Sequence, residues 1–132
     1  RMKKHILIVD DEADIRELLA EYLSQFGFRI TAVGSPDEAE RVVEKDLPNL
    51  IISDLQLEDS DGLSMVRAIK NKRPDMPVLL LTGIHFDPEV VRTKLSKTVT
   101  SYLQKTVALE RIVAEVRHLL NEGPAAPEGK KQ

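Results

Sequence analysis

The chain has 132 residues, a formal net charge of -3, 42% hydrophobic and 31% charged residues, and no cysteine. A chain of this length forms one domain whose core needs no disulfide, and the lack of cysteine excludes thiol chemistry. The small negative charge disfavours direct binding to nucleic acid or to an anionic membrane, and the longest apolar runs, at 6–9 and 78–81, are too short to span a bilayer. We therefore expect a cytoplasmic domain that does not bind membranes and whose natural start is Met2.

Five short apolar runs alternate with helical periodicities along the chain. The runs cover residues 4–9, 29–33, 50–53, 77–81 and 101–104. Three of them contain continuously apolar stretches, as strands do when helices cover both faces of the sheet. The alternation predicts an α/β fold in which a doubly wound, five-stranded parallel sheet is flanked by five helices.

The helices have marked starts and amphipathic faces. The first carries an apolar stripe and is followed by Gly27 as a stop signal, the second opens with the capping box at 35–38, and Asp87-Pro88 opens the fourth. The members of the first stripe are Ile15, Leu18, Leu19, Tyr22, Leu23 and Phe26. A last apolar period ends at Leu120, so we expect a folded domain over 3–120 and a flexible tail or linker over 121–132, which is rich in proline, glycine and alanine.

Three aspartates fall directly after two of the predicted strands. Asp10 and Asp11 follow the run at 6–9, and Asp54 follows the run at 50–53. Because the carboxyl ends of parallel strands meet at one edge of the sheet, the three carboxylates converge there and repel one another, at about 1 to 4 kcal/mol per pair. Such a cluster normally holds a hard divalent cation, and we predict a Mg²⁺ site for phosphoryl transfer.

Two further polar residues end predicted strands, Thr82 after 78–81 and Lys105 after 101–104. This set suits the phosphorylation of a carboxylate. Asp54 would be the nucleophile that forms an acyl phosphate, while Lys105 would neutralise a phosphoryl oxygen and Thr82 would donate a hydrogen bond to the attached group. The predicted Mg²⁺ ligands are Asp11, Asp10 through water, Asp54 and the backbone carbonyl of Gln56.

These motifs closely resemble the receiver domain of two-component response regulators, including the chemotaxis regulators, over about residues 3–120. They read Ile-Leu-Ile-Val-Asp-Asp-Glu at 6–12, Ser-Asp-Leu-Gln-Leu at 53–57, Leu-Thr-Gly at 81–83 and Tyr-Leu-Gln-Lys at 102–105. The resemblance implies a flavodoxin-like topology, Mg²⁺ dependence, slow self-catalysed dephosphorylation, and transfer to Asp54 from a sensor histidine kinase or phosphotransfer protein. It also implies a downstream output domain or protein and allows a homodimer. In the implied switch, Thr82 moves toward the phosphoryl group and Tyr102 turns inward, which remodels the face formed by the fourth helix, the fifth strand and the fifth helix.

The sequence departs from the family pattern at three places. Glu58 stands where members usually carry proline, and it opens an acidic loop at 58–61. Thr106 replaces the proline that usually follows the lysine, so we expect a trans Lys105–Thr106 bond, because a cis bond before a non-proline residue costs about 2.5 to 4 kcal/mol. Residues 97–99 replace the usual small-residue turn, and we expect a fourth helix that is short, displaced or poorly ordered.

Other interpretations use the same residues differently. Glu12 is read as a helix-start charge rather than a ligand, and Tyr102 could simply be partial core. The main alternative function is an interaction module with the receiver fold that no longer takes phosphate. A phosphohydrolase of the haloacid dehalogenase type is disfavoured because Glu12, not aspartate, lies two residues after Asp10, and a dinucleotide-binding domain is disfavoured because the turn at 10–14 has no glycine.

Overall fold

The computed structural model describes residues 2–54, 56–57, 60–83 and 87–123. Its main sheet has five parallel strands in the order β2-β1-β3-β6-β7, which confirms the predicted α/β fold. The strands are β1 (His5–Val9), β2 (Arg29–Val33), β3 (Leu50–Ser53), β6 (Val78–Thr82) and β7 (Ser101–Gln104). The chain order reverses between β1 and β3, and the crevice outside the carboxyl ends at such a point is where open α/β sheets hold ligands.

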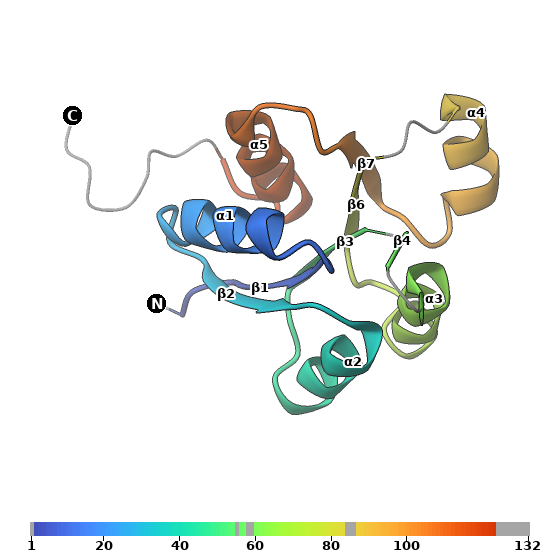
Figure 1. Cartoon of the computed structure of the whole chain (residues 1–132), viewed down its shortest axis with the longest axis horizontal. Helices are drawn as coiled ribbons and strands as arrows, with labels where there is room; N and C mark the ends of the chain where they lie inside the picture. The colour runs from blue at the N-terminus through green and yellow to red at the C-terminus, as the bar shows by residue number, and fades with distance from the viewer. Residues whose placement is uncertain (1, 55, 58–59, 84–86, 124–132) are drawn as a thin grey trace.

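Helices cover both faces of this sheet. The helices α1 (Ala13–Ser24) and α5 (Leu109–Leu119) lie on one face, and α2 (Pro36–Lys45) and α3 (Gly62–Lys72) lie on the other, as Figure 1 shows. The alternation of side chains along β1 divides the core accordingly: Ile6 and Ile8 join the cluster under α1 and α5, while Leu7 and Val9 join the cluster under α2 and α3. Strands buried on both faces require the continuously apolar runs seen in the sequence.

The predicted helix starts and stops largely agree with the structure. Ser35 caps α2 with its side-chain oxygen, which accepts a hydrogen bond from the Glu38 N–H at 3.3 Å. Gly27 has a φ of 85° after α1. Leu18 is an exception, because its side chain is 53% exposed although it belongs to the predicted stripe. A turn of about 100° per residue places Leu18 well away from Leu19, which is fully inside the core.

The fourth helix is short, as residues 97–99 led us to expect. An α-helical turn, α4 (Pro88–Val90), continues directly into a π-helical segment, η1 (Val91–Leu95). The Asp87 carboxylate caps the start by accepting from the Glu89 N–H at 2.8 Å. Among the described residues, a small cluster of Leu80, Leu95 and Val99 joins this region to the sheet.

Two loops can be compared with the sequence predictions, the one after β7 and the one between β3 and α3. Among the described residues no peptide bond is cis, so the Lys105–Thr106 bond is trans as predicted. Between β3 and α3 the structure has a short antiparallel hairpin, β4 (Gln56–Leu57) and β5 (Ser60–Asp61), which the sequence did not predict. The predicted acidic loop includes Glu58 and Asp59, which lie outside the described residues.

The helix α5 is followed by a turn in which Asn121 has a φ of 57°. The structure describes the chain to Gly123. Most of the predicted tail, residues 124–132, lies outside the described part. None of the helices within the described ranges has the length and apolar character needed to cross a bilayer.

Candidate functional site

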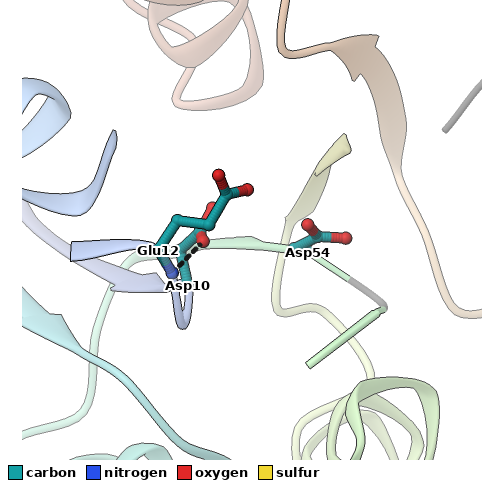
Figure 2. Close-up of side chains that lie close together, drawn as sticks. All are labelled: Asp10, Glu12 and Asp54. Carbon is teal, nitrogen blue, oxygen red and sulfur yellow. Dashed lines mark hydrogen bonds between the residues drawn. The ribbon is translucent and has the colours of Figure 1, made fainter. Parts of the chain in front are cut away.

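The parallel register of β1 and β3 brings two buried aspartates together. Val9 is paired with Ser53, and the N–H of Asp54 donates to the Val9 carbonyl at 3.2 Å, so Asp10 and Asp54 follow directly at the same edge. Asp10 is 2% exposed and Asp54 is 6% exposed. Figure 2 shows their side chains, with Glu12, at the carboxyl ends of the two strands.

Lys105 joins these acids from the end of β7. Its Nζ lies 2.8 Å from Asp10 Oδ2, 2.9 Å from Asp54 Oδ2 and 2.6 Å from Glu12 Oε1. The Lys105 N–H donates to the Thr82 carbonyl at 2.8 Å, which fixes the turn that presents the ammonium group. Burial lowers the pKa of Lys105, but the hydrogen bonds that its ammonium group donates to Asp10, Glu12 and Asp54 outweigh burial and raise this pKa well above the ordinary value. The lysine is therefore a permanent cation among three carboxylates.

Asp10 is held on every side. Its Oδ1 accepts from the Glu12 N–H at 2.8 Å, its Oδ2 faces Lys105, and its own N–H donates to the Val33 carbonyl at 3.1 Å. Burial raises the pKa of Asp10, and the contacts with Lys105 and the Glu12 N–H oppose that rise. The carboxylate is thus fixed in position before any ligand arrives.

Thr82 and Tyr102 lie on neighbouring strands beside this edge. Thr82 is the last residue of β6, is 1% exposed, and is paired with Gln104 of β7. Tyr102 is half-buried and packs against the cluster of Leu80, Leu95 and Val99. The strand ends therefore place Thr82 close to Lys105 in the fold, while Tyr102 packs against the cluster that includes Leu95 of η1.

The acidic group differs from the one predicted for the metal. Carboxylate oxygens of Asp10, Glu12 and Asp54 all lie within 4.8 Å of one another. Asp11 is half-buried in the same turn, and Gln56 begins β4, but neither belongs to the group found among the described residues. Glu12 was read as a helix-start charge; it is the N-cap residue of α1, yet its side chain makes no capping bond and instead binds Lys105. The three consecutive acids at 10–12 are visible in the sequence, but the turn geometry that brings the Glu12 carboxylate near those of Asp10 and Asp54 is not.

The residues present fit a hard cation. All three candidate ligands are carboxylates, which Mg²⁺ prefers, and the ammonium of Lys105 is a positive charge held at their centre. The position between Asp10 and Asp54 thus already accommodates one positive charge, that of Lys105.

Residues 6–117 match the protein family described as response regulator receiver domain. The regulatory protein VirG of Rhizobium rhizogenes is 29% identical over 127 residues, which are 96% of this chain and 52% of VirG. The chain thus spans about half the length of the curated relatives that it matches.

Solved structures agree with this family. The receiver domain of NtrX from Brucella abortus has a TM-score of 0.80 and 29% identity, and it covers 89% of this chain and 99% of its own. The chemotaxis response regulator CheY4 of Vibrio cholerae, at 23% identity, has a TM-score of 0.80, covers 89% of this chain and 99% of its own, and shares the fold. The chain belongs to the response regulator receiver domains, the phosphoaccepting signalling domains of two-component systems.

Proposed function

We propose that this domain accepts its phosphoryl group on the carboxylate of Asp54. The observation that carries the proposal is the placement of Lys105 Nζ at 2.9 Å from Asp54 Oδ2 at the buried carboxyl edge of β3. A carboxylate oxygen of Asp54 would attack the phosphorus atom of a phosphohistidine, the phosphorus–nitrogen bond would break, and its electron pair would leave with the imidazole. The fixed cation Lys105 would then neutralise charge on the phosphoryl oxygens.

Mg²⁺ is the proposed cofactor. Asp10, Asp11, Asp54 and the backbone carbonyl of Gln56 would hold it, with the Glu12 carboxylate within 4.8 Å of those of Asp10 and Asp54. When bound, the ion would offset the charge that develops on the transferring group. This chain's own residues would do the remaining work: Asp10 is already oriented by the Glu12 N–H, and Thr82 would donate its hydroxyl to the phosphoryl group.

The proposed partners follow from the family. A sensor histidine kinase or phosphotransfer protein would supply the phosphoryl group in the cytoplasm, and the domain would catalyse only its own phosphorylation and slow dephosphorylation. Because the chain spans about half of its curated relatives, we propose that residues 3–120 are the receiver and that 121–132 lead toward an output domain. The output face would be α4, η1, β7 and α5, where Tyr102 packs against the cluster of Leu80, Leu95 and Val99. We also propose that the domain can form a homodimer, as the family resemblance allows.

Labelling with acetyl phosphate tests the nucleophile. We expect Mg²⁺-dependent incorporation of one phosphoryl group in the wild-type chain, none in Asp54→Asn, and unchanged incorporation in Asp75→Asn, an exposed control aspartate. Intact-mass measurement reads the result directly. Full incorporation in Asp54→Asn would contradict the assignment.

The alternative is an interaction module that no longer takes phosphate. The departures at Glu58 and Thr106 leave this alternative open, but neither removes a proposed reacting group. Adding Mg²⁺ and then beryllofluoride, a mimic of the acyl phosphate, while recording backbone amide NMR spectra separates the two functions. A phosphoacceptor should show saturable shifts at Asp54, Thr82 and Lys105, whereas an interaction module should show none.

A further inference from the structure

Arg16 lies beside the acidic turn at residues 10–12 and has no role in the function proposed above. It lies in the first turns of α1 and is half-buried, and its Nη1 donates to the backbone carbonyl of Asp10 at 2.7 Å. Its backbone N–H donates to the Glu12 carbonyl at 3.0 Å. One residue therefore binds both ends of the turn that carries Asp10, Asp11 and Glu12.

The contact to the Asp10 carbonyl acts on the peptide plane between Asp10 and Asp11. The orientation of this plane sets the directions in which both side chains leave the backbone. The other hydrogen-bonding groups of Asp10 are already engaged, its N–H by Val33 and its carboxylate by Glu12 and Lys105. The guanidinium of Arg16 completes this set, because it binds the backbone carbonyl of Asp10.

Gly34 makes room for this contact. An ideal Cβ at Gly34 would lie 3.1 Å from Arg16 Nη1, 3.6 Å from its Cζ and 3.9 Å from the Asp10 carbonyl oxygen. The φ of Gly34 is not in the left-handed region, so the backbone does not itself demand glycine there. The missing side chain at the end of β2 is the space that the guanidinium occupies.

We infer that Arg16, seated over Gly34, is a positioning residue that holds the acidic turn in its cation-binding geometry. The role depends on the proposed function, since the cation is the Mg²⁺ of that site. Partners that orient metal ligands typically contribute about tenfold or more to metal affinity.

An electrostatic role and a positioning role of Arg16 predict opposite changes in Mg²⁺ affinity. Arg16 carries a positive charge next to a cation site, so a purely electrostatic role predicts that Arg16→Met binds Mg²⁺ more tightly. A positioning role predicts weaker binding. Gly34→Ala separates the two effects further, because its Cβ would crowd the guanidinium, 3.1 Å from Arg16 Nη1, without changing any charge.

The experiment is a Mg²⁺ titration of the full chain, followed by NMR of the Asp54 and Glu12 amides. We expect the Kd to rise about tenfold in Arg16→Met and severalfold in Gly34→Ala, with partial recovery in Arg16→Lys. We also expect Gly34→Ala to add nothing in the Arg16→Met background, because both changes act on the same contact of the Arg16 guanidinium. Gly123→Ala, whose Cβ meets no atom within 4 Å, is the matched glycine control, and Arg41→Met on α2 is the arginine control.

A second readout does not depend on metal. Without Mg²⁺, the Glu12 amide, which donates to Asp10 Oδ1, should exchange faster with solvent in both Arg16→Met and Gly34→Ala than in the controls. Tighter Mg²⁺ binding in Arg16→Met together with unchanged binding in Gly34→Ala would overturn the positioning role. A wild-type chain that bound no Mg²⁺ would overturn the proposed function, and this role with it, whereas normal wild-type binding with unaffected variants would overturn this role alone.

Discussion

At the scale of single residues, Lys105 determines how the acidic edge is stable without a metal ion. Its side chain is 8% exposed and faces Asp10 and Asp54, whose side chains are 3% and 7% exposed. Charges buried to this extent lose most of their hydration, so each depends on its partners. The lysine serves as a tethered counter-ion for carboxylates that would otherwise repel one another.

Lys105→Met should therefore destabilise the metal-free domain by about 3 kcal/mol, because it leaves buried carboxylates without a partner. Mg²⁺ at millimolar concentration should restore much of this loss by binding the folded state. Urea denaturation with and without Mg²⁺ measures both effects. Equal loss of stability under the two conditions would show that the lysine acts by packing rather than by charge.

His5 is a second residue whose charge state matters, and it lies at the opposite end of β1. It is 1% exposed, its Nε2 lies 2.7 Å from Thr31 Oγ1, and its Nδ1 has no hydrogen-bond partner among the described residues. Burial, followed by the nearby Arg29, lowers the pKa of His5 below 6.5, and Asp46 at 3.7 Å opposes this only in part.

This lowered pKa predicts a pH dependence of stability. The unfolded chain takes up a proton at His5 near pH 6.5, before the folded chain does, so the free energy of unfolding should fall as the pH decreases from 6.5 toward the lower folded pKa. Above pH 6.5 the effect should vanish. Urea denaturation between pH 8 and pH 5, compared with His5→Gln, should show a slope of up to about 1.4 kcal/mol per pH unit that the variant lacks. A His5 pKa of 6.5 or more, measured by NMR, would refute this account.

At the scale of elements, the end of α5 is closed by its own backbone. The N–H of Glu122 donates to the Arg117 carbonyl at 2.8 Å, and the N–H of Asn121 donates to the His118 carbonyl at 3.1 Å. These two bonds form a Schellman motif, with Asn121 at a φ of 57°. Arg117 reinforces the turn, since its guanidinium binds the Glu122 carboxylate at 3.2 Å and lies over the ring of Phe28. The chain therefore leaves α5 in a fixed direction.

Asn121→Val should cost about 1 to 2 kcal/mol of unfolding free energy, because a β-branched residue is strained at positive φ. Asn121→Gly should keep or slightly raise stability. Asn71→Val, an exposed position inside α3, serves as the control for the change of side chain. Equal losses at Asn121 and Asn71 would mean that the left-handed turn contributes nothing.

At the scale of the whole molecule, the described helices do not all pack on apolar clusters of the same size. Among the described residues, large apolar clusters lie under α1 and α5 and under α2 and α3, whereas Leu95 of η1 packs in a small cluster with Leu80 and Val99, and Tyr102 and Leu63 lie beside it. Segments with few buried apolar contacts open locally at low free energy. The proposed output face thus combines a stable scaffold with a weakly held segment.

Hydrogen exchange should show this difference. Amides at 88–99 should exchange much faster than those of β1 and β3, and beryllofluoride with Mg²⁺ should change the protection of 88–99 but not that of β1. Mass spectrometry of exchanged peptides measures both. Uniform protection along the chain would contradict the weak anchoring.

The sequence by itself determined the strands, most helix ends and the placement of Asp10, Asp54, Thr82 and Lys105 at strand ends, because period, burial and capping are local properties of the chain. The shortened fourth helix also followed from residues 97–99. Only the tertiary structure decided that Glu12 turns to Lys105, that Leu18 is exposed, that β4 and β5 pair, and that Arg16 sits over Gly34. These outcomes depend on turn dihedrals and on contacts between residues distant in sequence, such as the 93 positions that separate Glu12 from Lys105, and no local pattern encodes them.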